Sequence, residues 1–276
     1  LHALEDESGD VRDNAAGALG NISRRVTVKE AIEALVPGLI AALKRGDAES
    51  LPGVCTALAW VTRQTKDADL LRPGVEPLNV VLAQPAAPGQ TRAAQAAVAI
   101  GSAVGDQRLT ELGLSRLLKV LADDGADEQT RVSAAWAFEE AALHFVRDPT
   151  PLRPTIALLC EVLRDKTARI RVNAVGSLGT VLARLGDEAA LNQGAPSLLA
   201  TLKDEDAKVR HGAVFALGWV AQNVEDKALL SPAIAALTGA LKDDDAKVRA
   251  EAAKALEEIG TPEAKAALAA PRRARE

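Results

Sequence analysis

Few side chains in this sequence have the chemistry that catalysis requires, and those few lie far apart. The three histidines, His2, His144 and His211, fall in distant segments, and none forms a histidine–glutamate pair that would suggest a metal centre. The two cysteines, Cys55 and Cys160, occur within apolar stretches, where a thiol is usually inert packing. We therefore predict no catalytic thiol and no histidine-based metal site.

The acidic run Asp243–Asp245 has the carboxylates that a metal ion would need. The same residues coincide with a polar turn and with the position before a helix, where aspartate commonly accepts hydrogen bonds from backbone amides. We assign them a structural role, and we predict no catalytic residue, no cofactor and no metal in this chain.

The three tryptophans are the side chains best suited to recognition of a partner. Trp60, Trp136 and Trp219 stand out in a chain with only 2% aromatic residues and no tyrosine. Tryptophan is common at binding hot spots because it combines a large apolar surface with a polar N–H group. Their use depends on the elements that position them.

Composition and charge narrow the classes of partner. The formal net charge of −5 argues against a nucleic-acid backbone as the main partner, because such binding needs clustered positive charge. No apolar run approaches the roughly 18 residues that span a bilayer, no signal peptide opens the chain, and two cysteines suggest no disulfide framework. We expect a cytoplasmic protein with a protein or peptide partner, no nucleic acid and no membrane, acting as a monomer or within a larger chain or complex.

A repeat of about 39 residues organises the chain. The segments 202–210 and 241–249 are nearly identical copies at an offset of 39. Leucines that close the first helix of each repeat recur at spacings of 39 or 42: Leu4, Leu43, Leu82, Leu121, Leu163, Leu202 and Leu241. A period of this length is typical of helical-hairpin repeats.

Each repeat is predicted to contain a helix A, a tight polar turn and a helix B. Counted from Arg210 and its counterparts in the other repeats, apolar residues recur at offsets of 3, 4, 7 and 10, which share one helical face. We predict that this face forms the core. Four residues before the reference stand residue types favoured at helix N-caps: Ser8, Asp47, Gly89, Asp127, Thr167, Asp206 and Asp245.

The opposite face of helix B, at offsets 2, 5 and 9, is called here the helix B ridge. All three tryptophans fall on it. The residues predicted to bind a partner are Asn14, Asn21, Trp60, Arg63, Gln95, Trp136, Glu140, Asn173, Phe215 and Trp219. The alternative is that the rings fill space between successive B helices, beside small residues such as Gly179 and Gly218.

The period, with an aspartate that ends helix A and an arginine six residues later, resembles the HEAT repeat family. The matching pairs are Asp6 with Arg12, Asp165 with Arg171, Asp204 with Arg210, and Asp243 with Arg249. Repeat 2 has Arg45 and Leu51 at these positions, and repeat 3 has Gln84 and Ala93. The segment 15–22 is also similar to armadillo repeats. The resemblance implies an all-α, right-handed α-solenoid in which the pairs form a ladder of hydrogen bonds between neighbouring repeats.

We predict a single solenoid over residues 1–270 and a basic tail at 271–276. The expected repeats are 1–27, 28–66, 67–108, 109–148, 149–188, 189–227 and 228–262. Because Leu1–Glu5 supplies only the last turn of a helix A, we expect the first repeat to be incomplete and exposed.

The predicted function is a non-catalytic protein–protein interaction scaffold that holds an extended peptide or a partner helix along the concave helix B ridge. The resemblance leaves two alternatives, a DNA glycosylase-like enzyme acting on nucleic acid and a chromophore-lyase-like subunit. The first needs a basic groove and a catalytic acid, and it is disfavoured by acidic ridge residues such as Glu140, Glu251 and Glu258.

Overall fold

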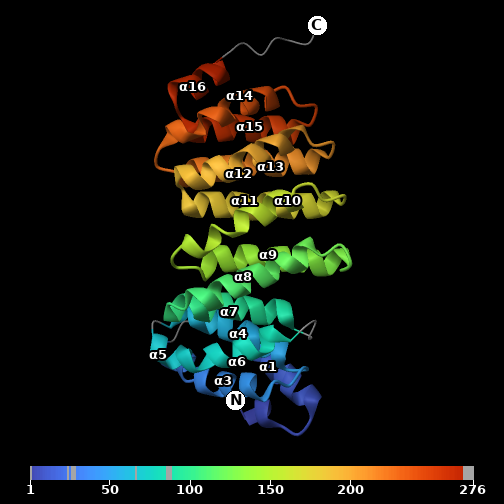
Figure 1. Cartoon of the computed structure of the whole chain (residues 1–276), viewed down its shortest axis with the longest axis vertical. Coiled ribbons are helices and arrows are strands. Elements are labelled where there is room, and N and C mark those ends of the chain that lie inside the picture. Colours follow the sequence, from blue (N-terminus) through green and yellow to red (C-terminus); the bar gives the residue numbers. More distant parts are fainter. Residues whose placement is uncertain (1, 24, 26–28, 66, 85–88, 270–276) are drawn as a thin grey trace. The chain divides into compact units, whose positions relative to one another are not determined.

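The structure, a computed structural model, describes residues 2–23, 25, 29–65, 67–84 and 89–269 (Figure 1). Within these ranges the regular structure is helical throughout, without strands. The all-α prediction is therefore confirmed. The chain divides into two compact units, Leu1–Pro151 and Leu152–Glu276, which are described separately below. The predicted tail at 271–276 lies outside the described residues.

Helices of the first unit occur in hairpins that follow one another in chain order (Figure 1). Their bounds are η1 His2–Glu5, α1 Gly9–Ser23, α2 Lys29–Glu33, α3 Val36–Arg45, α4 Leu51–Gln64, α5 Ala68–Leu71, η2 Arg72–Gly74, α6 Val75–Ala83, α7 Gln90–Val104, α8 Gln107–Ala122 and α9 Glu128–His144. Helix B of successive repeats corresponds to α1, α4, α7 and α9.

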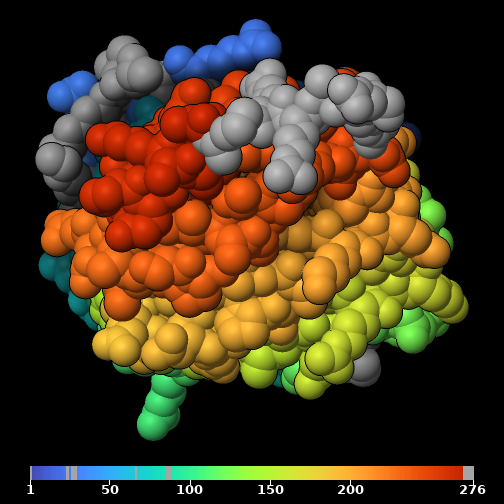
Figure 2. Space-filling model, turned by 90° about the horizontal axis from the view of Figure 1, so that it is seen from above, coloured from blue at the N-terminus to red at the C-terminus, as the bar shows by residue number. Residues whose placement is uncertain are grey.

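The second unit repeats the same hairpin arrangement. Its helices are η3 Thr150–Leu152 at the unit boundary, α10 Thr155–Val162, α11 Ala168–Leu185, α12 Glu188–Ala200, η4 Thr201–Lys203, α13 Ala207–Asn223, η5 Lys227–Leu230, α14 Ser231–Ala240, α15 Ala246–Ile259 and α16 Pro262–Ala269. Helix B corresponds to α11, α13 and α15. In the space-filling view of Figure 2, the orange and red atoms of the last hairpins lie in direct contact with the layer before them.

Helix A is interrupted in several repeats, and prolines account for the breaks. Pro37 occupies the first turn of α3, Pro73 the first turn of η2, and Pro232 the first turn of α14. Proline lacks the backbone N–H that a helix interior needs, so it is best tolerated where a helix begins. A new helix therefore begins one residue before each of these prolines.

The predicted core face of helix B is buried along most of the chain. From the second repeat onward, offset 3 is fully buried, and offset 7 carries large buried side chains that include Leu58, Ile100, Phe138 and Leu178. In the first repeat, by contrast, Ile22 at offset 10 is exposed. The periodicity thus located the core correctly in six of the seven repeats.

Six of the seven predicted N-cap positions immediately precede helix B, and Asp47 does not. Asp127, Asp206 and Asp245 also accept hydrogen bonds from amides in the first turn of their helices. In repeat 2, however, α4 begins only at Leu51, and its N-cap residue is Ser50. Pro52 lies in the first turn of α4, and the preference of proline for that place moves the helix start three residues onward.

Arginines and aspartates link the turns of neighbouring repeats. The guanidinium of Arg171 donates to both carboxylate oxygens of Asp204 at 2.8 Å. Arg210 does the same to Asp243 at 2.8 and 2.9 Å. Each arginine also donates to the backbone carbonyl of the aspartate in its own repeat, as Arg210 does to Asp204 at 2.9 Å. The ionic partner of each arginine is therefore the aspartate of the following repeat.

The junction between repeats 1 and 2 uses a different acid. Arg12 donates to Asp6 O at 2.8 Å within its own repeat, but its Nε donates to Asp47 Oδ2 at 2.7 Å. Arg45, which stands where the aspartate is expected, instead donates to the Leu4 carbonyl. In repeat 7, Arg249 donates to Asp243 O at 2.7 Å.

These bridges predict acid sensitivity of the first unit. The hydrogen bond from Arg12 lowers the pKa of Asp47 from 3.8 to about 2. Because the native carboxyl binds a proton less readily than the unfolded one, its contribution to stability is present above pH 3.8 and is lost as the pH falls toward about 2. Asp47→Asn should therefore reduce the dependence of the free energy of unfolding on pH below pH 3.8, measured by urea unfolding at successive pH values. Equal slopes for both proteins would show that this bridge is not responsible.

Candidate functional site: the helix B ridge

Small residues bring successive B helices into close contact. A Cβ added to Gly179 would lie 2.6 Å from the Ala216 Cβ, and one added to Gly53 would lie 2.5 Å from the backbone of Ala16. Both contacts show the same shift between successive B helices. A residue on one helix B faces the residue of the next helix B whose offset is smaller by two, as Gly179 at offset 8 faces Ala216 at offset 6. The Gly218–Ala255 contact, at 3.4 Å, repeats this register. The B helices α1 and α4 of the first unit, and α11, α13 and α15 of the second, therefore pack directly against one another.

In the second unit the ridge presents two large exposed rings one helical turn apart. Phe215 is 57% exposed and Trp219 is 37% exposed, both on α13. The observed register makes Lys254 and Glu258 the nearest ridge positions of α15 to Trp219. This apolar stripe thus has charged neighbours on α15.

Polar ridge residues of the second unit mostly bind their own helices. The Asn173 amide donates to Arg169 O at 2.7 Å, and the Asn223 amide donates to Trp219 O at 2.7 Å. Glu251 pairs with Lys254 at 3.1 Å. These bonds hold each polar side chain against its own helix, and Phe215 and Trp219 remain partly exposed.

The first unit treats its two tryptophans differently. Trp136 on α9 is 62% exposed. Trp60 on α4 is half-buried, because Phe145 meets its ring edge-on at 5.6 Å between centroids and His144 lies at 6.3 Å. The Arg63 guanidinium covers it at 5.6 Å. Trp60 is therefore partly covered by side chains of its own unit, and its predicted role in binding stays a prediction.

The contact of Trp60 with Phe145 reaches from repeat 2 to repeat 4, past the intervening helix α7. That helix is rich in alanine and has Gly101 and Ser102 on its course, and Ser102 Oγ accepts a hydrogen bond from Arg147 N at 2.8 Å. Small side chains in α7 leave room for the end of α9 to approach. The small residues of α7 are visible in the sequence, but only the structure shows that Phe145 contacts Trp60 past them.

One predicted ridge residue is not accessible. Gln95 is 1% exposed, and its amide group lies between Arg92, which donates to it at 3.0 Å, and Glu140, to which it donates. Glu140 and His144 lie on α9, and burial lowers the pKa of the His144 imidazole, as does the nearby Arg63. Gln95 is thus buried within a partly exposed polar network, contrary to its predicted place on the binding surface.

The remaining ridge residues, Asn14 and Asn21, are exposed on α1. The Asn14 amide donates to Asp10 O at 2.7 Å within its own helix. No described aromatic side chain accompanies them on α1. Of the predicted residues, the structure brings together Trp60 with Arg63, Gln95 with Glu140, and Phe215 with Trp219 on one helix. Asn14, Asn21, Trp136 and Asn173 are not among these contacts.

Three of the residues considered above for catalysis or metal binding, Cys55, Asp243 and Asp245, are buried in the core or bonded within the repeat turns. Burial raises the pKa of the Cys55 thiol to about 12, so the reactive thiolate is absent near neutral pH. Asp243 binds Arg210, and Asp245 caps α15. Among the described residues, no three His, Cys, Asp or Glu side chains form a group that could hold a metal ion.

Comparisons with known proteins agree with this architecture. Residues 195–274 match the family model for HEAT repeats. An engineered protein of known crystal structure is similar over 97% of this chain and 69% of its own, with 21% identity and a TM-score of 0.60. A designed armadillo repeat protein in complex with the peptide (KR)4 is similar over 94% of this chain and 97% of its own, with 18% identity and a TM-score of 0.53. No curated protein matches the chain.

The fold is therefore an α-solenoid of the HEAT and armadillo-like kind, as the repeat pattern predicted. The family model itself matches the last two repeats and the residues beyond them, where the sequence copies are most regular. Among the described residues, no helix combines the length and the apolarity needed to cross a bilayer.

Proposed function

We propose that this chain is a non-catalytic scaffold that binds an extended peptide or a partner helix along the helix B ridge. The observation that supports it best is the pair of exposed rings, Phe215 and Trp219, on one face of α13. Large exposed apolar side chains on a protein otherwise poor in aromatics mark interaction sites, and aromatic anchors supply much of the affinity of such sites.

Two further observations support a protein or peptide as the ligand. A designed armadillo repeat protein of similar fold is known in complex with a peptide. The chain has a net charge of −5, which argues against a nucleic-acid backbone as the ligand. The proposal includes a cytoplasmic location, which the two free cysteines fit.

Trp219→Ala should weaken binding by about 1–3 kcal/mol, since truncation removes an anchor ring from the interface. Because Trp219 is 37% exposed, its truncation should cost less stability than truncation of the more buried Trp60. The immobilised chain would capture its partner from lysate, mass spectrometry would identify it, and calorimetry would compare the affinities of the purified variants.

Trp60→Ala is the matched control for this experiment. The same truncation at Trp60 removes the contact with Phe145, so it should lower the free energy of unfolding more than the affinity. If Trp219→Ala destabilised the fold and left the affinity unchanged, the rings would be packing elements and the proposal would be wrong.

A further inference from the structure

The junction between repeats 2 and 3 lacks the arginine–aspartate bridge. Leu51 stands where Arg171 and Arg210 stand in later repeats, and Gln84 stands where Asp204 and Asp243 stand. At those later junctions the guanidinium crosses to the next turn and binds a carboxylate. Neither Leu51 nor Gln84 can form such an ion pair, so this junction has to be closed in another way or left open.

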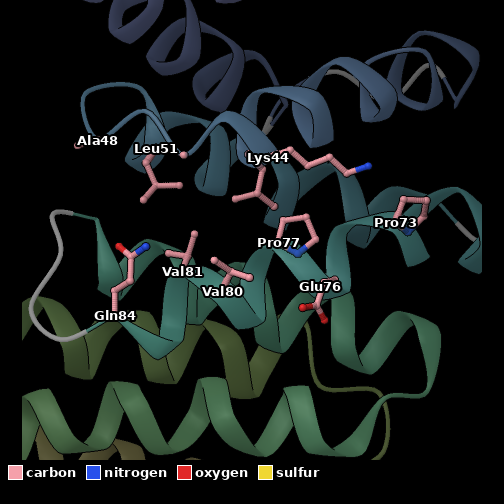
Figure 3. A pocket seen from close by; sticks show the side chains of 11 residues that line it. Lys44, Ala48, Leu51, Pro73, Glu76, Pro77, Val80, Val81 and Gln84 are labelled. Carbon is pink, nitrogen blue, oxygen red and sulfur yellow. The ribbon is translucent and has the colours of Figure 1, made fainter.

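A pocket of about 470 Å³ lies at this junction, between α3 and α6. Leu51 and Gln84 both line it, together with Pro77, Val80 and Val81 of α6. Figure 3 shows the Leu51 side chain directed across the opening toward Val81, with Gln84 at the same end. Both residues that depart from the bridge pattern therefore line this pocket.

The same groove recurs in the second unit with a different lining. It lies between α10 and α12, measures about 360 Å³, and is lined by Ser197, Ala200, Thr201 and Asp204. These residues correspond, 120 positions onward, to Pro77, Val80, Val81 and Gln84. Cys160 and Leu163 also line the groove at the bridged junction, so both grooves have apolar walls. The groove at the unbridged junction is the more apolar of the two, because it has Val80 and Val81 where the other has Ala200 and Thr201.

The groove at the unbridged junction has an unusually exposed apolar side chain. Val80 is 52% exposed, and it is the single large hydrophobic side chain with such exposure on a helix A of the described residues. Its counterpart Ala200 leaves no comparable apolar surface. An exposed valine beside buried Val81 and Leu51 is suited to contact with an apolar group from outside.

The rim of the apolar groove carries one charge of each sign. Lys44 lies on the α3 wall and Glu76 on the α6 wall (Figure 3), and neither side chain is buried. The walls run parallel to helix axes, and the nine residues of α6 extend over about 13 Å at the usual helical rise. That length matches two turns of a helix.

We propose that this groove binds a short amphipathic helix of a partner protein. Its apolar side chains, spaced i, i+4 and i+7, lie between α3 and α6, an acidic residue faces Lys44, and a basic residue faces Glu76. This site lies between A helices, is distinct from the helix B ridge, and does not depend on the function proposed above.

The test uses a fluorescein-labelled peptide of about 15 residues, alanine-based, with leucines at i, i+4 and i+7 and with glutamate and lysine on opposite flanks. Its matched probe has serine in place of each leucine. Anisotropy titrations should show saturable binding of the leucine probe and none of the serine probe. The expected loss of affinity on Val80→Asp is about tenfold or more, whereas Ala200→Asp, at the same place in the groove of the bridged junction, should have no effect.

Rebuilding the bridge gives a second test. Leu51→Arg with Gln84→Asp should place a guanidinium across the pocket. The urea midpoint of unfolding should rise or stay unchanged, and the affinity for the leucine probe should fall as it does in Val80→Asp. If the double variant does not fold, Val80→Asp alone decides. The proposal is overturned if the leucine probe does not bind, if the serine probe binds equally, or if Val80→Asp and Ala200→Asp behave alike. Loss of probe binding in Trp219→Ala but not in Val80→Asp would place the probe on the ridge and also overturn it.

Discussion

Phe138→Ala should lower the free energy of unfolding of the first unit by about 3–5 kcal/mol, because it removes a large buried ring and leaves a cavity. Phe138 lies at offset 7 of α9 and is completely buried. The helices around it are held by close contacts between small residues, such as Gly113 against the Ala94 backbone, so they cannot readily collapse into the vacated space. Urea unfolding followed by circular dichroism measures the loss.

Phe215→Ala is the matched control, since it makes the same chemical change at a 57% exposed position. Its effect on stability should stay within about 0.5 kcal/mol. Comparable losses at the two positions would contradict the assignment of Phe138 to the core and of Phe215 to the ridge.

Arg210→Ala should lower the free energy of unfolding of the second unit by about 1–3 kcal/mol. The substitution removes a two-pronged ion pair that joins repeats 6 and 7. It also leaves the Asp243 carboxylate, which is only 11% exposed, without its main partner. A charge that stays desolvated and unpaired costs more than the lost bond itself.

Arg249 supplies an internal reference for this measurement. Its Nη1 donates to the carbonyls of Asp243 and Asp244 at 2.7 and 2.8 Å, just as the Nη1 of Arg210 donates to the carbonyls of Asp204 and Glu205. Arg249→Ala therefore removes the bonds within a repeat only, and the difference between the two variants isolates the bridge between repeats.

A double-mutant cycle measures the same bridge independently. Arg210→Ala combined with Asp243→Asn should give a coupling energy similar in size to the difference between Arg210→Ala and Arg249→Ala. Equal losses in those two single variants would mean that the bridge contributes nothing.

The repeat architecture could be predicted because it is written in local patterns. A period of 39, apolar offsets that suit one helical face, and capping residues at fixed places all agree, and each depends only on residues near one another in the chain. The error at Asp47 has the same origin. Pro52, five residues later, controls where α4 begins, and an alignment of repeats by spacing alone overlooks such a local exception.

The site was harder to predict because burial on the ridge depends on neighbouring repeats. Helical geometry placed Gln95 and Trp60 on the correct face of their helices, but Glu140 of α9 and Phe145 directly after it cover them. The pocket at Leu51 and Gln84 illustrates the opposite case. The sequence revealed that these two residues break the pattern, whereas the pocket that they line became evident only from the arrangement of α3 and α6.

The bridges between repeats also make the chain divisible into interchangeable lengths. Arg171 binds Asp204, and Arg210 binds Asp243, with the same atoms and nearly the same distances. Excision of residues 204–242 would bring Asp243 to the place where Asp204 follows Arg171, and the chemistry of the new junction would be unchanged. Duplication of that segment would likewise create a junction of the existing type. A chain built in this way can be shortened or lengthened by whole repeats without any new pair of residues having to be matched.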